Sequence, residues 1–191
     1  MRWTDTLPPR AYGLGVVAIM GALALVLLAM GRVPICTCGT VKLWHGVVAS
    51  SENSQHISDW YSLSHVIHGL IFYWVLWLVG PSWPMGLRLV LAVLIESGWE
   101  IAENTDAVIN RYRDATISLD YYGDSVLNSV SDLGFMIIGF FAAHRLPVLA
   151  SVGMALAFEL LAATMIRDNL ALNIIMLLYP LDSIQAWQAG G

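Results

Sequence analysis

The sequence predicts an all-α fold, a polytopic membrane helix bundle with about five transmembrane helices and a possible short C-terminal interfacial helix. The first observation is composition: 58% of the 191 residues are hydrophobic and only 12% are charged, with a mean hydropathy of +0.68. Soluble domains carry about 25% charged residues, so an ordinary soluble protein is excluded. The second observation is that apolar windows recur, each near the roughly 20 residues that one bilayer crossing needs.

The first apolar window covers residues 12–30 and follows Arg2 and Arg10. This start resembles a secretory signal peptide. However, the apolar run is longer than a usual signal core, and no small-residue cleavage site follows it. We therefore expect a retained first helix. The stretch 31–60, rich in Ser, Gly and Asn, is predicted to form a loop outside the membrane.

This loop holds both cysteines of the chain, Cys36 and Cys38. A disulfide between such near neighbours would be strained, and two thiols alone do not complete a zinc site. We expect two unpaired structural cysteines, with redox or metal duty as the alternative.

The predicted spans after the first cover residues 61–79, 85–103, 122–143 and 148–165. A turn with two prolines, Pro81 and Pro84, separates the first two of these. The last apolar stretch, 170–181, is short for a span and is predicted to lie in the interface or to pack on the bundle. The whole chain, 1–191, is expected to form a single integral membrane domain.

Cationic residues give a near balance across the membrane. With the N-terminus inside, the inner side receives Arg2, Arg10, Arg88 and Arg145, and the outer side receives Arg32, Lys42, Arg111, Arg113 and Arg167. We expect the N-terminus inside because the first helix usually dominates. The nine Lys and Arg residues are scattered singly, so the lipid bilayer is the expected partner and nucleic acid is not. A protein partner is left open.

Polar residues collect on one side of the predicted bundle. In an alternating topology, the start of the second span, the end of the third and the start of the fourth share that side with the loop 31–60. The residues concerned are His65, His68, Glu96, Glu100, Glu103, Asp124, Asn128 and Asp132. Ionisable side chains at membrane depth are expensive and therefore indicate function. We expect this side to face the periplasm.

The histidines and glutamates each line one helix face. His65 and His68, at i and i+3, suit a first-row metal or a proton relay, and the alternative is hydrogen bonding to neighbouring helices. Three glutamates on one stripe cannot all stay ionised without cations or protons. Glu103 has the alternative of a place at the water interface.

The fourth span begins with Asp124, Asn128 and Asp132 at i, i+4 and i+8 of one face. Asp124 has the alternative of capping the helix N-terminus. Asp132 lies about 12 Å further along the helix, where it needs a partner such as a histidine, an arginine or a metal.

These residues support the hypothesis of a metal-dependent hydrolase or transferase acting on a lipid-linked or phosphorylated substrate. The expected ligands of a divalent metal are His65, His68, Glu100 and Asp124. The expected catalytic bases are Glu96 and Asp132, with Asn128 and Glu103 in support. Arg111 and Arg113 would hold the substrate phosphate, or would compensate the glutamates.

Two other functions explain the same residues. The cluster is either a structural polar network in a non-catalytic membrane component, or part of a path for protons or ions. The second alternative lacks a matching polar set on the opposite side and inverted repeats. A cavity that reaches the cluster would favour an enzyme, whereas tight packing around the cluster would favour a structural polar network.

Several motifs together resemble a known family. They are Cys36-Thr-Cys-Gly39, Trp44-His-Gly46, Ser64-His-Val-Ile-His-Gly69, Glu100-Ile-Ala-Glu-Asn-Thr105 and Tyr122-Gly-Asp-Ser-Val-Leu-Asn-Ser129. They are similar to those of an uncharacterised, placeholder-named family of multi-pass proteins, found mainly in alphaproteobacteria. The resemblance covers nearly the whole chain. It implies a place in the bacterial inner membrane and assigns no activity.

A looser resemblance is to the VanZ-like membrane proteins. These share a histidine early in one helix, a glutamate late in the next, and Asp-x3-Asn at the start of another. The matching positions here are His68, Glu100, and Asp124 with Asn128. The spaced aspartates are also faintly similar to those of CDP-alcohol phosphotransferases, whose full motif is absent, so that activity is not carried over.

Overall fold

A computed structural model describes residues 7–116 and 120–190 of the chain, and Arg2 of the orientation argument lies outside them. The described residues form eight α-helices and no strands. The helices are α1 (Pro9–Ala29), α2 (Ser62–Val79), α3 (Met85–Glu103), α4 (Asp106–Ala115), α5 (Val126–Arg145), α6 (Val148–Ile166), α7 (Leu170–Leu178) and α8 (Asp182–Gln188). The predicted all-α class is confirmed.

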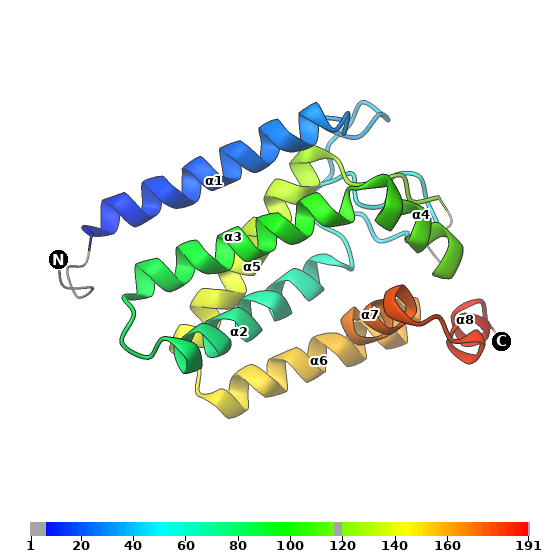
Figure 1. Cartoon of the computed structure of the whole chain (residues 1–191). Coiled ribbons are helices and arrows are strands. Elements are labelled where there is room, and N and C mark those ends of the chain that lie inside the picture. Colours follow the sequence, from blue (N-terminus) through cyan, green and yellow to red (C-terminus); the bar gives the residue numbers. More distant parts are fainter. Residues whose placement is uncertain (1–6, 117–119, 191) are drawn as a thin grey trace.

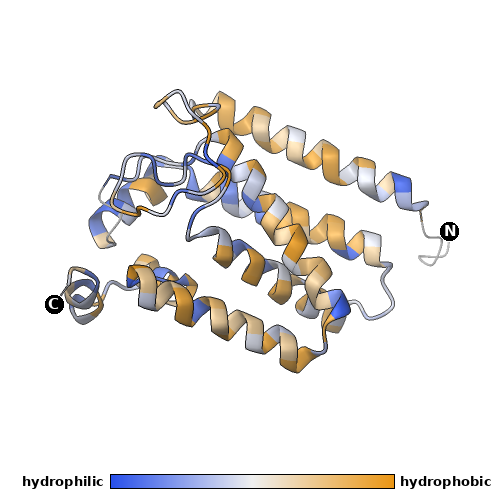
Figure 2. Cartoon of the chain, turned by 180° about the vertical axis from the view of Figure 1, so that it is seen from behind, coloured by the Kyte–Doolittle hydropathy of each residue, from blue (hydrophilic) through white to orange (hydrophobic). Residues whose placement is uncertain are grey.

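The five long helices, α1, α2, α3, α5 and α6, run roughly alongside one another (Figure 1). The shorter helices α4, α7 and α8 gather at one end, together with the loop that follows α1. Figure 2 shows hydrophobic residues along the long helices and hydrophilic residues concentrated at that same end. The molecule is therefore an elongated bundle with one polar end.

Four helices, α1, α2, α5 and α6, are long and apolar enough to cross a membrane. These four support a helical membrane bundle. Helix α3 has the bounds predicted for the third span and lies beside the others. It does not belong to the four, because its 19 residues carry Arg88 and three glutamates.

Prolines and short polar residues fix where the helices begin. Pro9 stands at the start of α1, where its missing N–H costs nothing and its fixed φ favours the helix. Helix α5 begins after Ser125, whose hydroxyl accepts a 3.1 Å hydrogen bond from the backbone N–H of Asn128. Ser125 is thus the N-cap, and the capping alternative for Asp124 does not apply.

Helices α2 and α5 approach closely at two glycines. A Cβ added at Gly69 would lie 2.0 Å from the carbonyl oxygen of Met136, and one added at Gly139 would lie 2.0 Å from that of Val66. Small residues allow such backbone contact between membrane helices. The core around this crossing includes the fully buried Phe140. The crossing fixes α2 and α5 against each other.

The loop 31–60 folds over the beginning of α5. Backbone N–H groups of Val126 and Ser125 donate to the carbonyls of Val33 and Ser54, at 2.9 and 3.0 Å. These bonds satisfy N–H groups that a helix start leaves without intrahelical partners. The loop is therefore a fixed cover of the polar end.

Cys36 and Cys38 form a disulfide, with Cα atoms 5.2 Å apart. The expectation of two unpaired cysteines is wrong. The N–H of Gly39 donates to the carbonyl of Cys36 at 3.0 Å, and Gly39 has a φ of +79°, a conformation that favours glycine. This turn brings together two side chains whose spacing alone argued against a bridge.

Two short helices modify the predicted connections. The polar stretch between the predicted third and fourth spans contains α4, whose buried residues include Ile109 and Tyr112. The last apolar stretch forms α7, which begins after the capping residue Asn169 and packs against α4. Together they close one side of the polar end.

Candidate functional site

The beginnings of α2 and α5 and the end of α3 bring the predicted polar residues together. We call this set the polar cluster; it consists of His65, His68, Glu96, Glu100, Glu103, Asp124, Asn128 and Asp132. Several members are almost wholly buried, with exposed fractions of 0% for Glu96, 1% for Glu100 and 4% for Asp132. Such burial of carboxyl groups requires specific partners.

Glu96 lies between the two histidines. Its Oε1 is 2.6 Å from Nδ1 of His65, and both of its oxygens are 3.0 Å from Nδ1 of His68. An ionised carboxylate only accepts hydrogen bonds, so both Nδ1 atoms donate to it. Each Nε2 lone pair is then free for another partner. Nε2 of His65 lies 3.8 Å from Oδ2 of Asp132.

The buried carboxyl group of Glu100 differs from that of Glu96 in its hydrogen bonding. Within residues 7–116 and 120–190, neither of its buried carboxylate oxygens has a hydrogen-bond partner. Nδ1 of His65, 3.5 Å from Oε1, makes an ion-pair contact only if that histidine is protonated. A buried, unsatisfied carboxylate costs free energy. A bound cation or a proton would remove that cost.

Three groups in the polar cluster have the composition and spacing to hold a metal ion. They are His65, His68 and Glu96; His65, Glu100 and Asp132; and Glu100, Glu103 and Asp124. In each group, one ligand atom per residue lies within 4.8 Å of the others. Imidazole and carboxylate ligands suit first-row divalent metals. His65 belongs to the first two groups and Glu100 to the last two, so the middle group contains both.

Asp124 is held by residues outside the predicted set. Its carboxylate accepts from Nδ2 of Asn104 at 2.8 Å and from the hydroxyl of Tyr121 at 3.0 Å. Burial raises the pKa of Asp124 to about 6, although both hydrogen bonds favour the ionised form. Asn104 was not singled out from the sequence, and its position directly after the acidic stripe of α3 was the available signal.

The loop adds a further buried carboxyl group, Asp59. Its oxygens accept from the backbone N–H groups of Ser54 and Tyr61, at 3.1 and 2.8 Å. Burial raises the pKa of Asp59. Its neighbour Ser62 donates to Oδ1 of Asp132 at 3.2 Å. The loop therefore takes part in ordering the polar cluster.

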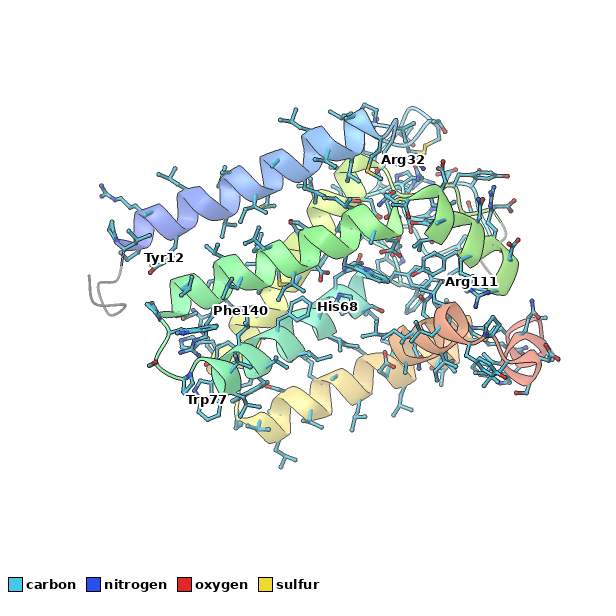
Figure 3. All side chains as sticks on the ribbon, viewed as in Figure 1. Tyr12, Arg32, His68, Trp77, Arg111 and Phe140 are labelled. Atoms are coloured by element: carbon cyan, nitrogen blue, oxygen red, sulfur yellow. A yellow bond between two sulfur atoms is a disulfide. The ribbon has the colours of Figure 1, made fainter. Side chains whose placement is uncertain are left out.

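Arg111 and Arg113 face other partners. Nε of Arg111 donates to the carbonyl of Leu177 at 2.9 Å, and Figure 3 shows this side chain on α4 beside α7. The guanidinium of Arg113 bonds to Asn110 and lies 4.9 Å from the ring centre of Tyr122. Among the residues that the structure covers, neither arginine pairs with a carboxylate of the cluster. Their substrate role stays a prediction.

A cavity of about 400 Å³ beside the loop 31–60 reaches Asp124, and two further cavities each reach several residues of the polar cluster. The larger of these two, about 240 Å³, is lined by His65, His68 and Glu96 together with apolar side chains that include Phe72, Trp99, Leu170 and Ile174. Figure 3 shows His68 on α2, facing the interior of the bundle. The smaller cavity, about 30 Å³ between His65, Glu103, Asp124 and Asp132, has room for a water molecule. The cluster is therefore open to ligands.

Comparisons with known proteins place the chain among proteins of undefined activity. A family described as "Protein of unknown function (DUF2585)" matches residues 27–190. A UPF0314 protein of Paracoccus denitrificans is 64% identical over 166 residues, covering 87% of this chain and 86% of the relative. A UPF0314 protein of Sinorhizobium fredii is 55% identical over 190 residues, covering 98% and 96%.

A third relative, the UPF0314 protein of Novosphingobium aromaticivorans, is 52% identical over 194 residues, which cover 97% of this chain and 96% of the relative. The predicted resemblance to an uncharacterised alphaproteobacterial family is confirmed. The looser VanZ-like resemblance is not shown by these matches. No solved structure matches the chain.

Proposed function

The chain belongs to the DUF2585 family, and we propose that it is an integral membrane enzyme, a metal-dependent hydrolase or transferase that acts on a lipid-linked substrate. The observation that carries this proposal is Glu100. Its two buried oxygens have no hydrogen-bond partner in the described part of the chain, and it belongs to two of the three metal-compatible groups. A divalent cation there would offset the cost of its burial.

The residues that would hold the metal are His65, Glu100 and Asp132, the group in which all three members are buried. Because Glu96 accepts from Nδ1 of His65, it would orient the imidazole and leave Nε2 for the metal. This assigns Glu96 to positioning rather than to proton abstraction. A metal at this place would supply a Lewis acid and an acidified water.

His68 is the residue best placed to exchange a proton with a substrate. It lines the 240 Å³ cavity, its Nδ1 is fixed by Glu96, and its ring stacks on Phe72 with centres 5.8 Å apart. A histidine oriented by a carboxylate is a common general acid or base. The expected metal role of His68 is thereby replaced by a proposed role in proton transfer.

The cavity supports a lipid-linked substrate. Its walls are mainly apolar, with the polar cluster on one side, so an acyl or prenyl segment would bury against Phe72, Trp99 and Ile174. The head group would then lie beside His68. Arg111 and Arg113 already contact other residues. A substrate phosphate would therefore have to be bound by the metal or by another cation.

The Cys36–Cys38 disulfide supports a periplasmic position for the polar end. Disulfides persist in oxidising compartments, including the bacterial periplasm. The loop that carries the bridge covers the beginning of α5, on the same side as the polar cluster. We propose that this end of the bundle faces the periplasm, with the N-terminus of α1 toward the cytoplasm and the protein in the inner membrane.

A second candidate function, a structural polar network in a non-catalytic membrane component, is favoured by Asp124. Its contacts with Asn104 and Tyr121 are complete without any ligand. That part of the polar cluster stabilises the packing of α3 against the beginning of α5. Glu100, in contrast, has no hydrogen-bond partner among the described residues. This difference favours metal binding and catalysis at the group of His65, Glu100 and Asp132.

The metal content of the purified full-length protein tests the proposal. The unmodified protein is expected to retain a divalent ion through chelator-free purification, and Glu100→Gln should lose it while remaining folded. Asp106→Asn, a change at a side chain that is 89% exposed, is the matched control and should keep the ion. A folded, metal-free unmodified protein that takes up no Zn²⁺, Mn²⁺ or Mg²⁺ would contradict the proposal and favour the structural network.

The reaction itself is tested with membrane lipid extracts. Extract incubated with the metal-loaded protein should yield new lipid products by mass spectrometry, and His68→Gln should reduce their rate by at least about 100-fold. Metal content should be unchanged in that variant. Equal product formation by His68→Gln would exclude the proposed proton-transfer role.

A further inference from the structure

We propose that the Cys36–Cys38 disulfide is a dithiol–disulfide exchange site that reacts with protein dithiols outside the membrane. It lies in the loop 31–60 rather than in the polar cluster, so this activity is independent of the proposed metal chemistry. The two cysteines differ in exposure: Cys36 is only 3% exposed, whereas Cys38 is exposed. An incoming thiolate can therefore reach the sulfur of Cys38 and not that of Cys36.

The surroundings favour Cys36 as the leaving group. The backbone N–H of Cys38 donates to Sγ of Cys36 at 3.2 Å. A nitrogen of His56, an oxygen of Glu52 and both sulfur atoms lie within 4.8 Å of one another. An N–H group that donates to sulfur stabilises a thiolate and lowers the barrier to its release.

His56 holds the carboxylate of Glu52 beside the two sulfur atoms. Its Nδ1 accepts from the backbone N–H of Lys42 at 3.3 Å, so Nε2–H is the donor of the 2.9 Å hydrogen bond to Glu52. The side chain of Lys42 also pairs with Glu52. The same tautomer disfavours a metal at Nε2, because that nitrogen would have to give up its proton.

The loop is held in place independently of the bridge. Carbonyl oxygens of Val33 and Pro34 accept from the backbone N–H groups of Val126 and Leu127, at 2.9 and 3.1 Å. Reduction of the disulfide would leave these bonds intact. The two thiols would thus stay near each other and near His56, ready for reoxidation.

Exchange moves two electrons from the donor dithiol to the cysteine pair. A thiolate of a protein dithiol attacks Sγ of Cys38, the Cys36–Cys38 bond breaks, and its electron pair remains on Sγ of Cys36, which accepts a hydrogen bond from the backbone N–H of Cys38 and takes a proton from water. The second thiolate of the donor then attacks the donor sulfur in the mixed disulfide and releases Cys38. The donor loses two electrons and two protons, which the cysteine pair gains.

A purely stabilising bridge explains these features poorly. Disulfide stabilisation in the chain-entropy model grows with the length of the closed loop, and this bridge joins residues only two positions apart. It restricts the unfolded chain little. The different exposure of the two cysteines contributes nothing to such a role, but it serves exchange.

The first test traps the attacked sulfur in the full-length protein in detergent. With glutathione disulfide, Cys36→Ser, which keeps the exposed Cys38, should form a mixed disulfide at least about tenfold faster than Cys38→Ser, which keeps the buried Cys36. Mass spectrometry of the intact protein measures both. Equal rates in the two folded variants would overturn the assignment of Cys38 as the reactive sulfur.

The second test measures reduction of the unmodified bridge by dithiothreitol, followed by maleimide labelling. Reduction should proceed in the folded protein, under conditions in which the protein does not unfold. His144→Gln, a change on the distant end of α5, is the control and should react at the unmodified rate. A bridge that opens only on unfolding would show a structural disulfide and overturn the proposal.

Discussion

The side-chain amide of Asn128 donates a 2.9 Å hydrogen bond to the backbone carbonyl of His56. Both residues are 1% exposed. The bond connects the first turn of α5, which carries the polar cluster, to the loop that carries the disulfide. It is one of several hydrogen bonds that hold the loop 31–60 against the beginning of α5.

Replacing Asn128 with alanine should destabilise the protein. The change leaves the buried carbonyl of His56 without its donor, which costs about 1–3 kcal/mol. Denaturant unfolding of the detergent-solubilised protein measures this loss, and Asn110→Ala, an exposed position on α4, is the control. Equal unfolding midpoints for the two variants would show that water replaces the lost amide.

Replacing Gly139 with alanine should disrupt the crossing of α2 and α5. The new Cβ would lie 2.0 Å from the carbonyl oxygen of Val66, so the backbones must separate at a cost of about 1–3 kcal/mol or more. Gly134→Ala on the same helix meets nothing within 4 Å and should be tolerated. Thermal unfolding distinguishes them, and a Gly139→Ala protein as stable as Gly134→Ala would contradict the described crossing.

Glu52 should make the loop sensitive to acid. Hydrogen bonds from Lys42 and His56 lower the pKa of Glu52 from 4.5 to about 2. A depressed pKa means that its contribution to stability is fully present above pH 4.5 and is lost as the pH falls toward 2.

Thermal unfolding between pH 5 and about pH 2.5 should therefore show a pH-dependent loss that Glu52→Gln reduces. Glu52 is partly exposed, so added salt should weaken the effect. An identical pH dependence in both proteins would exclude a contribution from Glu52. Asp182→Asn, a change at an exposed carboxylate that forms no ion pair with the described residues, is the control.

Filling the apolar cavity should block lipid binding without disturbing the metal site. Ile174 on α7 lines the cavity, and Ile174→Trp should reduce the binding of a fluorescent phospholipid by about tenfold or more. Leu178→Trp, at a position 79% exposed, should bind normally. Unchanged lipid binding by Ile174→Trp, with metal content preserved, would show that lipids do not use this cavity.

Much of the bundle could be predicted because helix length and hydropathy are local properties. The predicted third span, 85–103, has the same bounds as α3, and the predicted fifth, 148–165, ends one residue before α6 does. Helix α4 was missed because its residues are polar on average, although Thr105 caps it and its residues Ile109 and Tyr112 are buried against the rest of the fold. Local composition could not reveal that contact.

The alternating direction of the membrane spans predicted that the polar residues would lie at one end of the bundle. It did not predict which polar side chains would form hydrogen bonds with one another. Spacing on α2 placed His65 and His68 on one face, yet it gave no sign that Glu96 would sit between both rings. Likewise, the separation of Cys36 and Cys38 argued against the bridge that the turn at Gly39 permits. Such pairings depend on contacts between segments or on turn geometry.

The sequence by itself determined the class of the molecule and the end at which its chemistry would lie, because apolar length and buried charge are readable along the chain. Only the tertiary structure decided which carboxylates are satisfied and which are not. Asp124 is completed by Asn104 and Tyr121, whereas Glu100, only four residues from Asn104, is left without a hydrogen bond among the described residues. That difference arises from which helices meet at each side chain, a property that no single segment contains.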